Sequence, residues 1–206
     1  MALRTMRIAA TSLISATLAG LTPTAAIAVT YNAVKQFSFT ANPGRYWSYT
    51  INGALLTTAE NPCGSVTGLE CWSNGGTEPH NAVAGKNITG GTINQGGVVL
   101  PKNYLGLDPQ AEPNVAVTWL APKAGTYTVN SIFLGIQETT DAHGVAVLHN
   151  TTSVFSSTIS SYGKKRKFKT TIAVAKGDTI SFLVSYEGGD KDIATGLSAS
   201  IKPAAQ

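Results

Sequence analysis

The hydrophobic residues of this chain recur mostly at every second position, in short runs separated by turn-forming residues. The most regular run places Ile180, Phe182, Val184 and Tyr186 at alternate positions. A period of two is the pattern of a strand with one buried face. Short strands at this spacing predict an all-β domain, and we favour a jelly-roll-like antiparallel β-sandwich, whose successive strands can alternate between two sheets. Further runs with this pattern cover residues 31–40, 47–51, 145–149, 168–174 and 197–201.

The stretch from Asn114 to Ile136 contains two such runs around a turn at residues 122–125. Its first run alternates up to Trp119, and its second begins at Tyr127 but shifts phase after Asn130. A shift of phase predicts either a β-bulge or a strand that is buried on both faces. We expect the two runs to form adjacent central strands of the sandwich.

The segment from Asn61 to Gln110 is the least regular part of the chain and is rich in glycine and proline. Long irregular loops are uncommon in compact domains and often carry function. Both cysteines, Cys63 and Cys71, lie in this segment. In an exported protein such a pair predicts a disulfide that closes a short loop. A zinc site would need more ligands at suitable spacing, and His80 alone completes it poorly.

The first 28 residues have the pattern of a secretory signal peptide. Arg4 and Arg7 precede an apolar stretch from Ile8 to Leu21, and residues 26–28 spell Ala-Ile-Ala, a typical cleavage site. The apolar stretch is short of the ~20 residues that a membrane span needs. We therefore expect residues 1–28 to be a bacterial-type signal peptide, and residues 29–206 to be one secreted, extracellular or periplasmic β-sandwich domain that does not span a membrane.

The positive net charge of +4 arises largely from one run, Lys164, Lys165, Arg166, Lys167 and Lys169. Clustered basic residues attract polyanions such as acidic glycans, lipopolysaccharide or nucleic acid. The strand period offers a second interpretation, in which the lysines face outward on an exposed strand and prevent aggregation through its edge. We favour this second interpretation, and we expect no nucleic acid partner.

Four stretches of the C-terminal half follow one another in a familiar order: VAVTWLAPKAGTYTV, VAVLHNTTSVFSSTI, IAVAKGDTISFLV and DIATGLSASI. Together with FSFTANPGRYWSYT, they resemble jelly-roll, galactose-binding-like modules of exported bacterial proteins, some of which carry a PEP-CTERM sorting tail. The resemblance extends from about Phe37 to Ile201, with a poor match from Asn61 to Glu112, and the sequence shows no sorting tail. It implies a module that binds carbohydrate or assists glycan-active proteins, although a shared fold is only an associational argument for function.

A sugar ring packs its C–H faces on aromatic side chains, and Trp72 and Tyr104 lie in the irregular segment. Exposed aromatic residues on loops are good binding candidates, so we expect these two to contact a ligand. Asn74, His80 and Asn103 could supply hydrogen bonds nearby. The alternative is that the segment buries its own tryptophan as a local core.

No catalytic motif stands out, and the only cofactor that we consider is a structural calcium ion. Ca²⁺ takes six to eight oxygen ligands, and Asp190, Asp192 and either Glu138 or Asp141 could supply some of them. We therefore expect a non-enzymatic module that binds carbohydrate or a cell-envelope glycan. The alternatives are a structural protein that self-associates through an exposed strand edge, and, ranked last, a polysaccharide-active hydrolase.

Overall fold

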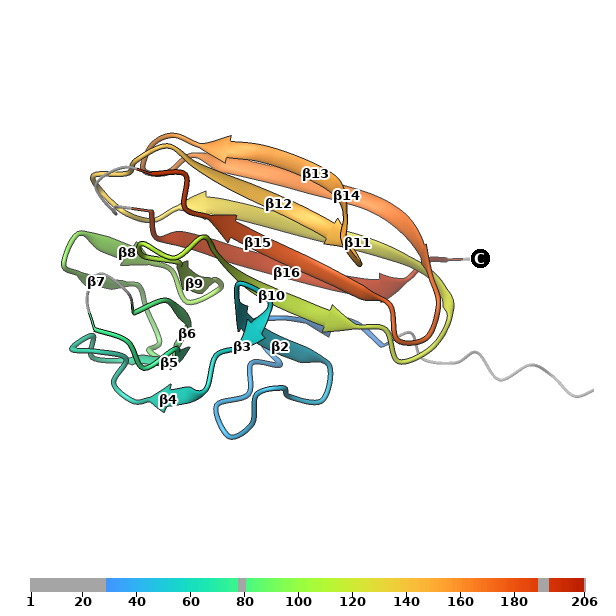
Figure 1. The fold of residues 1–206 in the computed structure, drawn as a ribbon, viewed down its shortest axis with the longest axis horizontal. Helices are drawn as coiled ribbons and strands as arrows, with labels where there is room; N and C mark the ends of the chain where they lie inside the picture. The colour runs from blue at the N-terminus through green and yellow to red at the C-terminus, as the bar shows by residue number, and fades with distance from the viewer. Residues whose placement is uncertain (1–28, 78–80, 189–192, 206) are drawn as a thin grey trace, which may run out of the picture.

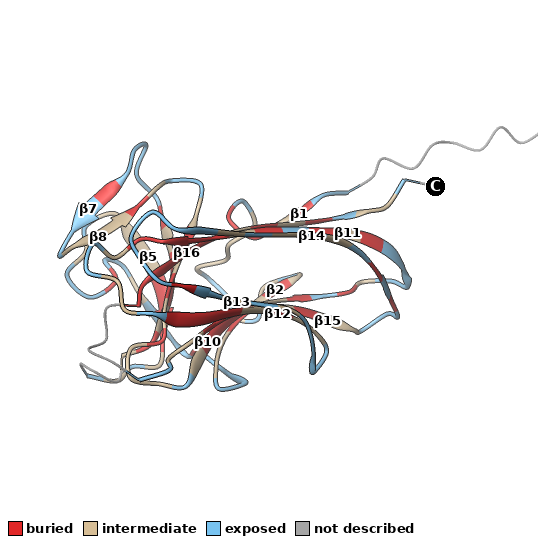
Figure 2. Cartoon of the chain, turned by 90° about the horizontal axis from the view of Figure 1, so that it is seen from above, coloured by how far each residue is buried: buried red, intermediate tan, exposed pale blue. Residues whose placement is uncertain are grey.

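A computed structural model describes residues 29–77, 81–188 and 193–205 of the chain. Two antiparallel sheets pack face to face, and the described ranges contain no helix (Figures 1 and 2). The prediction of an all-β, jelly-roll-like sandwich is therefore confirmed. No helix in these ranges is long and apolar enough to cross a membrane. The predicted signal peptide lies outside the described residues.

The larger sheet has eight strands and the smaller sheet six, and a separate hairpin has two. The path through the larger sheet is β14-β11-β16-β9-β6-β5-β4, with β1 paired to β16, and the path through the smaller sheet is β13-β12-β15-β10-β2-β3. The strands of the larger sheet are β1 (Tyr31–Asn32), β4 (Thr58–Glu60), β5 (Leu69–Ser73), β6 (Val83–Asn87), β9 (Leu105–Asp108), β11 (Gly125–Gly135), β14 (Lys165–Val174) and β16 (Thr195–Pro203). Those of the smaller sheet are β2 (Trp47–Ile51), β3 (Ala54–Leu55), β10 (Asn114–Leu120), β12 (His143–His149), β13 (Thr152–Ile159) and β15 (Thr179–Ser185). The hairpin consists of β7 (Ile93–Gln95) and β8 (Val98–Leu100).

The main core fills the space between the two sheets with every second side chain of their strands. In β15, Ile180, Phe182 and Val184 are buried and the residues between them are partly exposed. Burying an aliphatic or aromatic side chain contributes about 1.5–3 kcal/mol, so this alternation determines which face of each strand points inward.

The two runs between Asn114 and Ile136 are not hydrogen-bonded neighbours, so the expectation of adjacent central strands is wrong. The first run forms β10 of the smaller sheet and the second forms β11 of the larger sheet. The turn between them carries the chain from one sheet to the other. Trp119 and Tyr127 consequently face each other across the core, with their ring centroids 5.0 Å apart.

The phase shift in β11 marks a strand that is buried on both faces, as one of the two alternatives predicts. Its pairing with β14 and β16 continues in register from Tyr127 to Leu134, without a bulge. Phe133 points into the main core, whereas Leu134 belongs to a second apolar cluster together with Ile136. This second cluster lies on the outer face of the larger sheet, beneath the β7–β8 hairpin.

The segment from Asn61 to Gln110 extends the larger sheet despite its glycines and prolines. Strands β5, β6 and β9 pair in succession beyond β16. The predicted disulfide joins Cys63 to Cys71, whose Cα atoms are 5.4 Å apart. Such a bond is typical of an oxidising compartment. The turns of this segment and the hairpin gather at one end of the molecule (Figure 1).

The edge strands β13 and β14, one from each sheet, are linked across the side of the sandwich. Arg166 of β14 donates from Nε to the carbonyl oxygen of Thr158 at 2.8 Å, and the rings of Phe155 and Phe168 lie 5.2 Å apart. Arg166 thus forms a hydrogen bond with one backbone carbonyl group of the edge strand β13. Self-association through an exposed strand edge stays a prediction.

Candidate functional site

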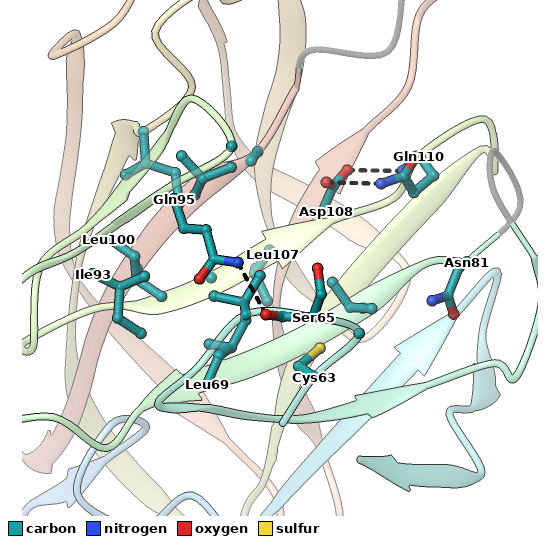
Figure 3. A pocket seen from close by; sticks show the side chains of 18 residues that line it. Cys63, Ser65, Leu69, Asn81, Ile93, Gln95, Leu100, Leu107, Asp108 and Gln110 are labelled. Atoms are coloured by element: carbon teal, nitrogen blue, oxygen red, sulfur yellow. Dashed lines mark hydrogen bonds between the residues drawn. The ribbon is translucent and has the colours of Figure 1, made fainter. Parts of the chain in front are cut away.

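A cavity of 280 Å³ lies on the outer face of the larger sheet, at the end where the irregular segment gathers. Strands β6 and β9, the turn after Cys63 and the β7–β8 hairpin form its walls (Figure 3). Its lining includes Ser65, Val66, Leu69, Asn81, Val83, Ile93, Gln95, Val98, Leu100, Leu107, Asp108, Gln110, Ile136 and Ala194. We call it the outer cavity.

Three glycines give the hairpin and its neighbouring loops room to approach the sheet. The strand registers place Gly85, Gly106 and Gly196 side by side across β6, β9 and β16. A Cβ atom on Gly106 would lie 3.2 Å from Leu100 Cδ2, and one on Gly196 would lie 3.0 Å from Ile136 Cγ2. Glycine suits this close approach, because a Cβ atom at either position would require Leu100 or Ile136 to shift by a few tenths of an ångström.

Side-chain hydrogen bonds and the disulfide hold the walls of the outer cavity in place. Gln95 donates from Nε2 to the carbonyl oxygen of Ser65 at 2.9 Å, which joins the hairpin to the disulfide turn. The buried amide of Asn87 donates to the carbonyl oxygen of Leu100 at 2.8 Å. Walls fixed in this way suit a binding site, because a preformed site loses less entropy when a ligand binds.

The lining of the outer cavity is divided into an aliphatic side and a polar side. Figure 3 shows Leu69, Ile93 and Leu100 toward one side, and Asn81, Asp108 and Gln110 toward the other. Both carboxylate oxygens of Asp108 accept hydrogen bonds from Gln110, one from its backbone N–H at 3.0 Å and one from its side chain at 3.1 Å. The Oδ1 atom of Asn81 is buried and accepts no hydrogen bond from any described residue. The cavity thus offers an apolar surface opposite a set of hydrogen-bonding groups.

The predicted exposure of Trp72 is wrong. The side chain is only 8% exposed, belongs to the main core, and donates from its indole nitrogen to the carbonyl oxygen of Ser38 at 2.7 Å. The reason is its position in β5, because the side chains of the neighbours Cys71 and Trp72 point to opposite faces of the sheet. Cys71 is paired with Gly85 on the outer face, and Trp72 with Ala84 on the inner face. Trp72 is therefore a structural residue of the inner face. It is buried, as the alternative expects, but in the main core between the sheets and not in a local core of the irregular segment.

The other candidate ligand-binding residues are not brought together around Trp72. Tyr104 packs, partly buried, against the second apolar cluster on the opposite face of the sheet. Asn103 is exposed, Asn74 accepts a hydrogen bond from the backbone N–H of Gly76, and His80 lies outside the described residues. The outer cavity itself was missed because its lining comes from segments far apart in the sequence. The glycines Gly85, Gly106 and Gly196 are visible in the sequence, but their alignment is known only once the strand pairing is known.

The metal candidates stay predictions. Asp190 and Asp192 lie outside the described residues, and the carbonyl oxygen of Asp141 contacts the ring of His143. Within the described ranges, one group of potential ligand atoms lies close together, namely those of Glu60, Cys63 and Cys71. The two sulfur atoms are bonded to each other, so they are not available as thiolate ligands.

His143 is buried between the sheets, and its ring is held at both nitrogens. Nδ1 lies 2.7 Å from the carbonyl oxygen of Asp141, and Nε2 lies 2.6 Å from the hydroxyl of Thr195. Because a carbonyl only accepts, Nδ1 carries the proton. In the neutral ring, Nε2 then accepts from the Thr195 hydroxyl, whose oxygen also lies 3.2 Å from a second acceptor, the carbonyl oxygen of Ile193. Burial lowers the pKa of His143, which favours the neutral ring in the folded protein.

We expect the lowered pKa of His143 to make the fold sensitive to mild acid. In the unfolded chain, His143 takes up a proton near its ordinary pKa of about 6.5, whereas in the folded chain it does so only at lower pH. The contribution to stability is therefore complete above pH ~6.5 and is lost as the pH falls below it. Urea unfolding at pH 7.5 and pH 5 measures this loss in the wild type and in His143→Gln. An equal loss in both proteins would show that another group is responsible.

The geometry described above defines a β-sandwich with a preformed cavity on the outside of one sheet. No family model and no curated protein matches the sequence. Among solved structures, the chain is similar to a CBM35 from Paenibacillus barcinonensis, with 14% identity over 86% of this chain and 99% of the other and a TM-score of 0.37. It is also similar to the K1 cleaved adhesin domain of Lys-gingipain from Porphyromonas gingivalis W83, with 11% identity over 88% and 100% of the two chains and a TM-score of 0.40. A third similar structure is CBM51 from Clostridium perfringens GH95 in complex with methyl-galactose, with 11% identity over 75% and 99% and a TM-score of 0.37. These likenesses are remote and assign neither a ligand nor an activity to this chain.

Proposed function

We propose that this protein is an exported, non-enzymatic β-sandwich module that binds carbohydrate in the outer cavity. The observation that carries the proposal is the two-sided lining, aliphatic around Leu69, Ile93 and Leu100 and polar around Asp108 and Gln110. A sugar ring has the matching character, with apolar C–H faces and hydroxyl groups around its edge. Asp108 can accept hydrogen bonds from hydroxyl groups, and the Gln110 amide can donate to them.

The size of the outer cavity indicates how much of a glycan it takes. Its 280 Å³ is near the lower limit of the ~300–1,000 Å³ typical of small-molecule sites. We infer that it receives one sugar residue, such as a chain end or a side branch, rather than a length of polysaccharide.

Two further features support the non-enzymatic and exported parts of the proposal. Glycoside hydrolysis generally uses a pair of carboxyl groups across a cleft. Asp108 is the one carboxylate in the described lining of the outer cavity, so a pair is not provided there. Export is supported by the signal-peptide pattern of residues 1–28 and by the disulfide.

Blocking the mouth of the outer cavity is expected to abolish glycan binding without unfolding the protein. Ser65 is exposed and contributes its backbone carbonyl to the hydrogen bond with Gln95, so Ser65→Trp adds a bulky side chain while keeping that bond. We expect at least a tenfold loss of binding to any glycan that the wild type retains on an array, which corresponds to about 1.4 kcal/mol.

Thr67→Trp is the matched control, because Thr67 is exposed in the same disulfide-linked turn but does not line the cavity. Its binding should stay within twofold of the wild type. Equal binding by both variants would move the site away from the outer cavity. If the wild-type protein retained no glycan across a broad array, the proposed function would be wrong.

A further inference from the structure

The basic run and one distant lysine lie on the same outer face of the larger sheet. Lys165, Lys167 and Lys169 alternate along β14 and are exposed. In the adjoining strands, Thr171 of β14 pairs with Thr128 of β11, and Thr128 pairs in turn with Lys202 of β16. Paired residues point to the same face of a sheet, so Lys202, which is also exposed, lies on the face that carries the three lysines of β14. We call these four residues and the positions between them the lysine face.

Neutral hydrogen-bonding side chains lie between these lysines. Lys169 pairs with Asn130, which pairs with Ser200, and Lys167 pairs with Ile132, which pairs with Ser198. None of the four lysines forms an ion pair with a carboxylate in the part of the chain that the structure describes. The registers therefore place cationic and neutral polar groups on this face, with an isoleucine among them.

Protection of the sheet edge explains only part of this arrangement. Lysines on the edge strand β14 discourage pairing with another chain. Lys202, however, lies on β16, which pairs with β11 on one side and with β9 and β1 on the other. Lys202 therefore does not protect a free sheet edge. Arg166 points the other way from the lysines and donates to the carbonyl oxygen of Thr158, so the five-residue basic run serves two separate purposes.

We propose that the lysine face binds an acidic polysaccharide, carrying carboxylate or sulfate groups, along the outside of the larger sheet. Alternate lysines of a strand are about 6.8 Å apart, which provides a regular row of cations for a chain with regularly repeating negative charge. The serine, threonine and asparagine side chains between them can bond sugar hydroxyls. The inference rests on the proposed function only for the class of ligand, because the lysine face and the outer cavity share no residues.

An aromatic side chain lies at one end of the lysine face and favours a glycan over other polyanions. Tyr162 is 48% exposed and lines a shallow hollow together with Pro101, Leu134 and Lys165. One tyrosine beside a lysine can pack against a sugar ring. Single-stranded nucleic acid is usually bound by several aromatic residues on which successive bases stack, and the paired positions of this face offer none.

The test compares a sulfated polysaccharide with its neutral parent, which has the same backbone, and adds a carboxylated polysaccharide of a different backbone. The full mature chain is titrated with dextran sulfate, dextran and polygalacturonate at 50 mM and 300 mM salt. We expect binding to the two acidic polymers but not to dextran, and a marked weakening at the higher salt because exposed charges are screened. Lys167→Gln with Lys169→Gln should weaken the affinity about tenfold, and Lys202→Gln alone about threefold.

Matched controls separate the lysine face from the net charge and from the outer cavity. Lys123→Gln with Lys176→Gln removes two exposed lysines from the turns before β11 and after β14, outside the paired positions of this face, and should change the affinity less than twofold. Ser65→Trp should leave binding to acidic polymers unchanged, so that failure here and failure of the proposed function remain distinguishable. Equal weakening by both double variants, no effect of Lys202→Gln, or tighter binding to poly(dT) than to the acidic polysaccharides at equal salt would overturn the inference.

Discussion

Replacing Trp72 with alanine is expected to lower the free energy of unfolding by about 4 kcal/mol. The indole is buried in the main core, where it lies beside the ring of Phe39 with a centroid separation of 6.5 Å. Alanine would leave a large cavity and would also leave the carbonyl oxygen of Ser38 without its hydrogen bond. Losses of this size are a large fraction of the 5–15 kcal/mol that typically stabilises a domain. Urea unfolding followed by tryptophan fluorescence and circular dichroism measures the change.

Trp72→Phe is the control for this prediction. Phenylalanine keeps most of the apolar volume but loses the hydrogen bond to Ser38 and part of the ring, so its cost should be about half as large or less. The outer cavity lies on the opposite face of the sheet, and any Trp72→Ala protein that remains folded should still bind the ligand of the wild type. If Trp72→Ala were instead fully stable but no longer bound the ligand, the indole would be a binding residue after all.

Removing the disulfide, as Cys63→Ala with Cys71→Ala, is expected to cost about 2.5 kcal/mol. The two cysteines are separated by 8 positions, and closing even a short loop in the unfolded chain reduces its entropy. The effect should extend to the outer cavity, because Cys63 lines it and the turn after Cys63 is bonded to the hairpin through Gln95. Thermal unfolding of the double variant and of the reduced wild type measures the loss.

The reduced wild type and the double variant should agree, since both lack the same crosslink. If the variant were as stable as the oxidised protein, the turn would be held by its hydrogen bonds alone, such as that from the Gly64 backbone N–H to Glu60 at 3.0 Å. A variant that kept its stability but lost its glycan would show that the crosslink orders the site without stabilising the fold.

The sequence was sufficient to predict the sandwich because most long strands show their burial directly. Alternation in β15 and in the later part of β14 identifies the inward face of each strand. The disulfide followed from the number and spacing of the cysteines. The sheet to which each strand belongs did not follow, because a short turn such as residues 122–125 can form a hairpin or connect opposite sheets with equal ease.

The candidate site was harder to predict for a physical reason. Burial of Trp72 depends on whether β5 pairs with β6, and the sequence of β5, Leu-Glu-Cys-Trp-Ser, shows no clear alternation of hydrophobicity. The outer cavity depends on Gly85, Gly106 and Gly196 coming into line, which needs the registers of three strands that are distant in sequence. Only the basic run was visible in advance, and its division between Arg166 and the lysines became clear from the strand pairing.

In the functions proposed above, the larger sheet separates stability from recognition, with one on each face of a single backbone layer. Residues such as Val129 and Ile201 point inward and stabilise the fold, whereas their neighbours Asn130 and Ser200 point outward. Exchanges at the outward positions leave the interior contacts intact, so the surface can diverge toward new ligands with little risk to folding. Homologues of this chain should therefore differ most in residue type at the outward positions of β11, β14 and β16. The inward positions between them should stay apolar.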